Sequence, residues 1–353
     1  MDAVKHRLKS FFIKVVVAVS GVMLIALRNE VSAEISKALT LCADVLIPSL
    51  FPFMVLSAFA VSVAYQSKKN RIIAFIMSRI FRLPYAAFSA VIFGFLGGYP
   101  VGGRVISALY EKGSISSKDA RHLFSFCVNA GPAFIVSVAG GVVTGSVTAG
   151  YAMFSAVVMS SFVVGVLYAR MRRKTADECV CLPEKKITVG DSLVSAVTGS
   201  AYGILAVCGW VIAFSAFSVT VKFFLSESRI FGLYLSLSEI TSGVYTAVSM
   251  GGLPFMAACI SFGGLSVLCQ LLPEIKKCGI KVYEYLFFRI VNSILSYFVT
   301  SLIMRFVDIS IPTVSQYEAQ LHFAPASAML LVMCAVLIAD LASVNRKKTG
   351  IFG

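Results

Sequence analysis

Charged residues are scarce in this chain, and their scarcity excludes most soluble folds. Only 14% of its 353 residues are Asp, Glu, Lys or Arg, whereas 58% are apolar, which is far from the balance of a soluble domain. The net charge of +14 comes from Lys and Arg in short loops between apolar runs. That pattern indicates the positive-inside rule of membrane proteins rather than nucleic acid binding. The composition predicts a polytopic membrane protein.

The usual motifs of catalysis are also absent. The three histidines are scattered, the nine cysteines form no CxxC pair, and no GxxxxGK[ST] phosphate-binding loop occurs. These absences remove metal-ligand sets, paired nucleophiles and bases, and nucleotide loops. We therefore expect no enzyme activity, no cofactor and no bound metal.

Long apolar runs predict the membrane layout. Eight of them have the roughly 17–25 residues or more that a membrane span needs: 11–27, 38–65, 123–143, 147–169, 196–224, 253–272, 283–307 and 326–344. Two further apolar stretches, 84–110 and 230–250, are interrupted and are predicted to be re-entrant hairpins. The stretch 72–82 predicts an interfacial amphipathic helix.

The distribution of basic residues supports this layout. With two hairpins, the great majority of the 31 Lys and Arg residues fall on one side of the membrane, so both termini are expected in the cytoplasm. Reading either hairpin as a full span would invert everything after it and remove the asymmetry.

The order of elements predicts two oppositely oriented repeats, as in many secondary transporters. Each repeat has a span, a hairpin and two further spans, with every direction reversed in the second. The predicted boundaries are 1–37 for an N-terminal accessory span, 38–169 for the first repeat, 170–190 for a cytoplasmic linker, 191–307 for the second repeat, and 308–353 for an outer loop and C-terminal accessory span.

Four interruptions, two in each repeat, are expected to meet near the middle of the membrane. They are 97–103, 129–132, 238–243 and 261–266. Gly and Pro release backbone groups that hydrocarbon tolerates only beside protein or water, although glycine in membrane helices often serves close packing alone. The released helix N-termini suit an anionic group, so a small anionic substrate is predicted there. The released carbonyls and hydroxyls suit a sugar, another hydroxyl-bearing ligand or a coupling cation.

Two charged residues carry the sharpest hypotheses. Arg104, directly after the first interruption, is expected to clamp a substrate carboxylate, or else to extend toward the cytoplasmic interface. Glu239 is expected to be a proton- or cation-linked gate, or else to form an ion pair with Arg104 or Arg289. The remaining substrate-binding candidates are Gly98, Tyr99, Pro100, Gly102, Asn129, Gly131, Thr241, Ser242, Ser261, Gly263, Gly264, Ser266 and Gln270.

Five motifs in order resemble a known family. They are Ile-Pro-Ser-Leu-Phe-Pro-Phe at 47–53, Gly-Tyr-Pro-Val-Gly-Gly-Arg at 98–104, Asn-Ala-Gly-Pro at 129–132, Glu-Ile-Thr-Ser-Gly at 239–243 and Ser-Phe-Gly-Gly-Leu-Ser-Val at 261–267. Together they resemble the YlbJ-type sporulation integral membrane proteins, also called SpoVV, over roughly residues 38–305. That family belongs with the nucleoside-recognition (Gate) domain proteins, which look like a distant branch of concentrative nucleoside transporters.

The resemblance implies a transporter that moves dipicolinic acid from the mother cell across the outer forespore membrane during endospore formation. Two alternatives stay open: transport of a nucleoside or another small metabolite, and a non-transporting membrane scaffold in spore envelope assembly. The expected partners are a small anionic substrate and membrane lipid, with no nucleic acid. A coupling ion (proton or sodium) and assembly as a homo-oligomer are left open by the residues.

Overall fold

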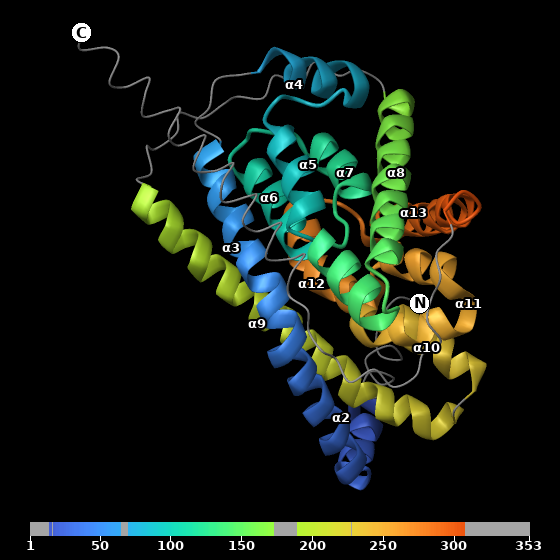
Figure 1. Cartoon of the computed structure of the whole chain (residues 1–353). Helices are drawn as coiled ribbons and strands as arrows, with labels where there is room; N and C mark the ends of the chain where they lie inside the picture. Colours follow the sequence, from blue (N-terminus) through green and yellow to red (C-terminus); the bar gives the residue numbers. More distant parts are fainter. Residues whose placement is uncertain (1–13, 16, 65–69, 173–188, 227, 308–353) are drawn as a thin grey trace, which may run out of the picture.

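The regular elements of the protein are helices in every part of the chain that the structure describes. The computed structural model describes residues 14–15, 17–64, 70–172, 189–226 and 228–307 (Figure 1). The predicted span 326–344 lies outside the described residues, as does most of the linker 170–190. The predicted all-α class is confirmed for the described part.

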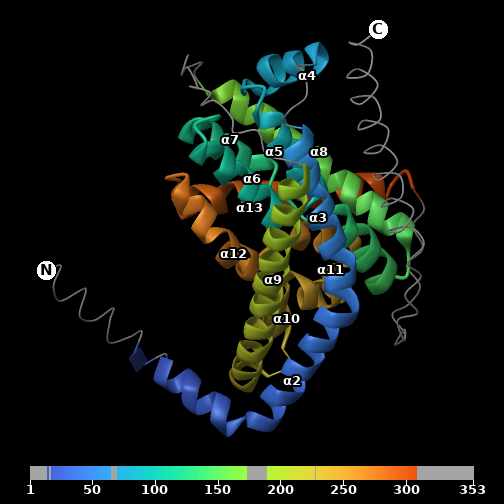
Figure 2. The ribbon, with the colours of Figure 1, turned by 90° about the vertical axis from the view of Figure 1, so that its left-hand side faces the viewer.

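Two long helices cross each other along one flank of the molecule. The first is formed by α2 (Arg28–Leu41), the π-helical segment η1 (Cys42–Leu46) and α3 (Ile47–Ala64), which continue one another; the second is α9 (Val189–Leu225). α9 packs against both α2 and α3, and the two helices run in opposite chain directions (Figure 1, Figure 2).

The first long helix begins earlier than the sequence predicted. It starts at Arg28 rather than at residue 38. Its early turns are polar and exposed, and Lys37 Nζ lies 2.7 Å from Glu34 Oε1. Such i,i+3 pairs support helix outside an apolar run, so hydropathy alone placed the boundary too late.

Each predicted hairpin consists of two helices that pack against each other. The pairs are α5 (Ala87–Leu96) with α6 (Tyr99–Glu111), joined by Gly97 and Gly98, and α10 (Arg229–Ser238) with α11 (Ile240–Phe262), joined by Glu239.

Glycine lets the two arms of each hairpin approach. A Cβ added to Gly102 would lie 3.0 Å from the Cα of Gly94, and one added to Gly243 would lie 2.8 Å from the carbonyl oxygen of Leu235. Each hairpin therefore places a glycine opposite its partner arm, where a side chain would force the backbones apart.

The hairpin interruptions are shorter than the sequence predicted. Because α6 begins at Tyr99, Gly102 and Gly103 are helical. Because α11 begins at Ile240, Glu239 is the only residue outside a helix within the predicted interruption 238–243. Pro100 does not break α6, since it stands in the first turn, where its missing N–H has no helical partner. The chain reverses at Gly98 instead, whose φ is +80°.

The helix after each hairpin is interrupted, as predicted. In the first half of the chain the two half-helices are α7 (Ser117–Phe126) and η3 (Ala133–Val143). In the second half they are the part of α11 after its kink at Gly251 and Gly252, and α12 (Gly264–Lys277). η3 has 11 residues and α12 has 14, whereas crossing about 30 Å of hydrocarbon takes about 20. The predicted spans 123–143 and 253–272 are thus pairs of half-helices.

Loops that were predicted to share one side of the membrane contact one another. Arg172 Nη1 lies 2.6 Å from Asp119 Oδ1, Arg82 donates to the Arg172 carbonyl at 3.2 Å, and Ser117 Oγ donates to the Cys278 carbonyl at 2.7 Å. These contacts join the ends of the segments before α5, between α6 and α7, after α8 (Val147–Met171), and between α12 and α13 (Val282–Ile303).

The predicted amphipathic segment is helical over α4 (Arg71–Phe75) and η2 (Ile76–Phe81). Its exposed side chains include Ile72, Phe75 and Ile80, as expected of a helix that lies against an apolar phase.

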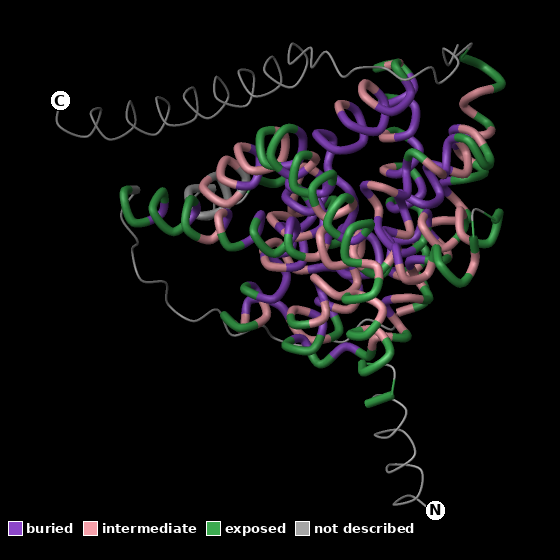
Figure 3. The backbone as a smooth tube through the Cα atoms, turned by 90° about the horizontal axis from the view of Figure 1, so that it is seen from below, coloured by how far each residue is buried: buried purple, intermediate pink, exposed green. Residues whose placement is uncertain are grey.

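Helix α13 is apolar outward and polar inward. All buried residues of α13 are polar or tyrosine (Tyr285, Arg289, Asn292, Ser296 and Thr300), while Phe287, Ile290, Ile294 and Phe298 are exposed. Buried backbone gathers at the centre of the molecule and exposed positions at its periphery (Figure 3). This arrangement is the reverse of a water-soluble helix and suits a lipid environment.

Five helical stretches in the described residues are long and apolar enough to cross a membrane. They are Arg28–Leu56, Val147–Met171, Gly190–Leu225, Ile240–Lys277 and Val282–Ile303. The fourth contains the interruptions described above, so it is not one straight helix.

Candidate functional site

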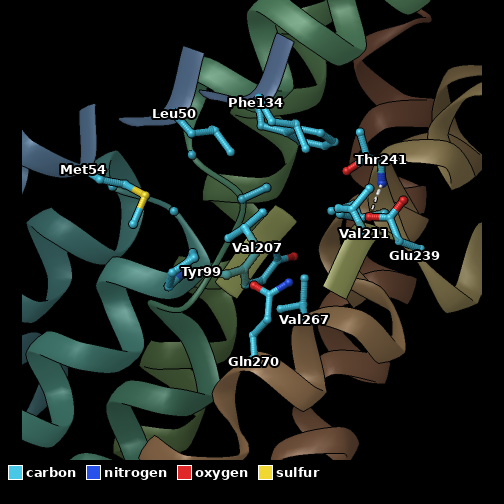
Figure 4. A pocket seen from close by; sticks show the side chains of 17 residues that line it. Leu50, Met54, Tyr99, Phe134, Val207, Val211, Glu239, Thr241, Val267 and Gln270 are labelled. Carbon is cyan, nitrogen blue, oxygen red and sulfur yellow. Dashed lines mark hydrogen bonds between the residues drawn. The ribbon is translucent and has the colours of Figure 1, made fainter. Parts of the chain in front are cut away.

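A cleft lies between the two long helices and the interruptions (Figure 4). It has about 550 Å³ of empty volume, its open side included. The long helices contribute Leu46, Leu50, Met54, Val207 and Val211; the interruptions and helix ends contribute Gly97, Gly98, Tyr99, Pro100, Ala130, Gly131, Glu239, Ile240 and Thr241; and the half-helices η3 and α12 contribute Phe134, Val267 and Gln270.

The four interruptions meet beside this cleft. A Cβ added to Gly131 would lie 3.2 Å from the amide nitrogen of Gly98, which joins the two interruptions of the first half. One added to Gly264 would lie 3.2 Å from the carbonyl oxygen of Ser238, which joins those of the second half. Tyr99 links the halves, because its ring lies 3.1 Å from the Cβ position of Gly263 and its hydroxyl donates to the Ile260 carbonyl.

Glu239 is buried and caps its own helix. Its Oε1 accepts from the Thr241 amide at 2.9 Å, and its Oε2 accepts from the Ser242 amide at 2.7 Å and the Ser242 hydroxyl at 2.9 Å. A helix N-terminus offers free N–H groups and a partial positive charge, which stabilise a carboxylate without a cation. The alternative of an ion pair with Arg104 or Arg289 is not seen among the described contacts.

The polar part of the cleft wall is small. Besides Glu239, it consists of Tyr99, Thr241 and Gln270, and Figure 4 shows their side chains beside the apolar ones of Val207, Val211 and Val267. An apolar wall with a few fixed polar groups is typical of a ligand site.

Seven of the fifteen predicted site residues line the cleft: Gly98, Tyr99, Pro100, Gly131, Glu239, Thr241 and Gln270. The other eight do not. Gly102 packs against α5, Ser242 bonds Glu239, and Gly263 and Gly264 pack against Tyr99 and Ser238. Ser266 is buried, and its hydroxyl has no partner among the described residues. Arg104, Asn129 and Ser261 contact other helices instead.

Arg104 is not among the residues that line the cleft. Its Nη1 donates to the carbonyl of Gly199 on α9 at 2.5 Å, and this guanidinium lies next to Met54 and Gly203 at the crossing of the long helices. Arg104 lies one turn into α6, and its side chain contacts α9. Its closeness to Pro100 along the sequence did not predict this contact.

Asn129 and Ser261 instead belong to a buried polar network on the opposite side of the interruptions. Asn129 Oδ1 accepts from Ser161 at 3.1 Å, and the hydroxyls of Ser261 and Ser160 each bond Ser296 on α13 at 2.5 and 2.7 Å. This network runs from α8 through the interruptions to α13.

The centre of that network is Arg289, which the sequence suggested only as an ion-pair partner of Glu239 and not as a binding residue. The residue is fully buried, and its Nη1 donates to Val128 O at 2.6 Å, Asn129 Oδ1 at 3.2 Å and Ser261 O at 3.2 Å. The available signal was an arginine in the middle of an apolar run, which is a functional candidate by default. Asn292, Ser296 and Thr300 follow it at spacings of three, seven and eleven, on one helix face.

Among the described residues, no three His, Cys, Asp or Glu side chains gather in a way that could hold a metal ion. The groups at the interruptions are hydrogen-bond donors and acceptors, one carboxylate and one guanidinium. Such a set can bind and orient a polar ligand.

The fold and the site define an integral membrane protein whose broken helices meet beside a central cleft. The chain is 29% identical over 213 residues, or 54% of its length, to the sporulation integral membrane protein YlbJ of Bacillus subtilis (strain 168). It spans about half of that relative, 51%. The resemblance to YlbJ-type proteins that the motifs predicted is thereby confirmed. No family model matches the chain, and no solved structure matches it.

Proposed function

We propose that the protein is a secondary transporter of a small organic anion. The observation that carries the proposal is the meeting of four helix interruptions, two from each half of the chain, beside one cleft. Broken helices with released backbone groups at a central point are the usual binding architecture of secondary transporters.

An inverted repeat gives this arrangement a mechanism. In this proposal each element of the first repeat has a counterpart in the second. Helix α3 corresponds to α9, and the hairpin α5–α6 corresponds to α10 with the first part of α11. The half-helices α7 and η3 correspond to the second part of α11 and α12, and α8 corresponds to α13. The opposite directions of the two long helices and the glycine contacts within both hairpins support the correspondence. Rocking of one repeat against the other would then open the cleft alternately to each side.

The two hairpins differ in a way that favours an anion. The N-terminus of α11 is occupied by the Glu239 carboxylate, whereas the N-terminus of α6 at Gly98 has no side-chain cap and faces the cleft. A substrate carboxylate could take the position on α6 that Glu239 takes on α11. Glu239 itself would respond to a coupling proton or cation.

The resemblance to YlbJ-type proteins supplies the specific substrate, dipicolinic acid. The relative is named for sporulation, and dipicolinate is a planar aromatic dicarboxylate that suits an apolar cleft with an uncapped helix end. We propose transport from the mother cell across the outer forespore membrane, with both termini in the cytoplasm.

Uptake by proteoliposomes tests this proposal. Purified protein is reconstituted, and uptake of radiolabelled dipicolinate is compared with that of a nucleoside panel, with and without a proton or sodium gradient. We expect saturable dipicolinate uptake that Gly98→Leu abolishes, because the leucine would fill the α6 end. Gly209→Ala is the matched control, since a Cβ there meets nothing within 4 Å.

Each other result favours a different function. Nucleoside uptake without dipicolinate uptake would support the nucleoside alternative. No uptake of any solute by correctly folded protein, together with tolerance of substitution at Glu239 and Asn129 in sporulating cells, would support a scaffold.

A further inference from the structure

Arg289 is a buried cation with unused hydrogen-bond donors. Its Nη1 serves all three of its described acceptors, while Nε and Nη2 are buried and have no partner among the described residues. A guanidinium offers its donors in a planar fork that matches a carboxylate. The unused donors are therefore suited to one more oxygen-bearing group.

The charge of Arg289 is not paired by any carboxylate of the described residues. No carboxylate oxygen of the described residues lies within 4.0 Å of its nitrogens. Asp119 pairs with Arg172, and Glu284 pairs with Arg121. The carbonyls of Val128 and Ser261, at the ends of α7 and α11, offset part of the charge through the negative ends of those helices. A buried cation without a full counter-charge favours an anion.

Further polar atoms on the same face of α13 lack partners. The Tyr285 hydroxyl and Asn292 Oδ1 are buried and unpartnered among the described residues, one turn to either side of Arg289. The ring of Tyr285 lies 5.6 Å from the guanidinium carbon. Because buried polar atoms normally have partners, these atoms mark a place where water or a ligand belongs.

Tyr99 lies between this place and the cleft. It lines the cleft, its hydroxyl donates to the carbonyl of Ile260, and the next residue, Ser261, accepts from Arg289. The Tyr99 side chain is thus the barrier that an anion in the cleft would have to pass.

We propose that Arg289 binds a carboxylate of the transported anion through Nε and Nη2, in a state in which Tyr99 has released the Ile260 carbonyl. This inference rests on the proposed function and assigns the anion-binding arginine to α13 in place of Arg104. Asn292 and Tyr285 line the same subsite.

Binding measurements on the purified full chain in lipid nanodiscs test the inference. The probes are dipicolinate and its neutral analogue pyridine-2,6-dicarboxamide, and the variants are Arg289→Gln, Arg289→Lys and the control Arg305→Gln, an exposed arginine at the end of the same helix. We expect Arg289→Gln to weaken dipicolinate binding about tenfold or more and to leave diamide binding nearly unchanged. Arg305→Gln should bind both probes like the wild type.

The ratio of the two affinities separates binding from folding. Structural damage would weaken both probes alike and leave the wild-type ratio unchanged, which would overturn the inference. If Arg289→Gln does not give folded protein, Arg289→Lys decides: it keeps the charge but loses the fork, so it should bind dipicolinate several-fold more weakly. Equal dipicolinate affinity in the wild type and in folded Arg289→Gln or Arg289→Lys would overturn the role of Arg289 and leave the transporter proposal standing. Failure of the wild type to bind any carboxylate would overturn both.

Discussion

At the scale of single residues, Glu239 illustrates how a carboxylate can be buried without a cation. Three hydrogen bonds from Thr241 and Ser242 hold it at the start of α11. We predict that Glu239→Ala lowers the stability of the protein by about 1–2 kcal/mol, because the helix loses its cap.

Thermal unfolding in detergent measures this loss. Glu30→Ala is a suitable control, since Glu30 is exposed in the first turn of α2. Equal unfolding midpoints for both variants would contradict the capping role.

Gly98 is required by its backbone conformation. Its φ of +80° disfavours any residue with a Cβ, and that Cβ would lie 3.3 Å from the Gly131 amide nitrogen. We predict that Gly98→Ala destabilises the protein by about 1–2 kcal/mol. Gly209→Ala in α9 should be neutral or stabilising, because alanine favours helix and meets no neighbour there. Unfolding midpoints of both variants in one detergent give the comparison.

The half-buried Arg104 and the fully buried Arg289 are expected to affect transport differently. Arg104 contacts the Gly199 carbonyl outside the cleft, so Arg104→Ala should reduce dipicolinate uptake by proteoliposomes less than Arg289→Gln does. The sequence alone predicted the loss at Arg104. If Arg104→Ala lost all dipicolinate uptake while Arg289→Gln stayed active, Arg104 would be the carboxylate clamp that the sequence predicted.

At the scale of elements, both hairpins depend on contact between their arms. A Cβ at Gly243 would lie 2.8 Å from the Leu235 carbonyl oxygen and 2.9 Å from the Ser236 Cα, and neither backbone atom can move without its helix. We predict that Gly243→Ala lowers stability by about 1–3 kcal/mol, as overpacking does.

Gly141→Ala is the matched change, because its Cβ would make an ordinary contact at 3.7 Å. Size-exclusion profiles and unfolding midpoints of the two variants measure the difference. A Gly243→Ala protein as stable as Gly141→Ala would mean that the arms of the second hairpin do not pack as described.

At the scale of the whole molecule, the proposed two-repeat layout predicts which loops share a side of the membrane. Lys112 follows α6, Lys276 lies in the last turn of α12, and Arg229 begins α10. Cysteines placed at Lys112 and Lys276, in a chain with its native cysteines replaced by serine, should react with an impermeant thiol reagent only from the cytoplasm. A cysteine at Arg229 should react only from the opposite side, and labelling of all three from one side would contradict the inverted repeat.

Much of the layout could be predicted from particular residues. The hairpins and the interruptions at 129–132 and 261–266 followed from Gly and Pro within apolar runs, because these residues release backbone groups wherever they break a helix. Seven of the residues predicted for the site line the cleft. The start of the first long helix could not be predicted, since its first turns, from Arg28 to Lys37, are polar helix beyond the apolar run. The hairpin breaks were also predicted to be longer than they are, because Gly102 and Gly243 lie in helices and allow contact between the arms instead of forming turns.

The sequence by itself determined that this is a helical membrane protein with interrupted segments, because hydropathy, charge position and backbone breaks are properties of local stretches. Only the tertiary structure decided which of those residues meet. It joined Gly98 to Gly131 and Ser238 to Gly264, and it turned Arg104 toward α9. It also placed Arg289, from a helix far along the chain, at the ends of α7 and α11. Side-chain direction and long-range packing set these contacts, and neither can be predicted from the spacing of residues along the chain.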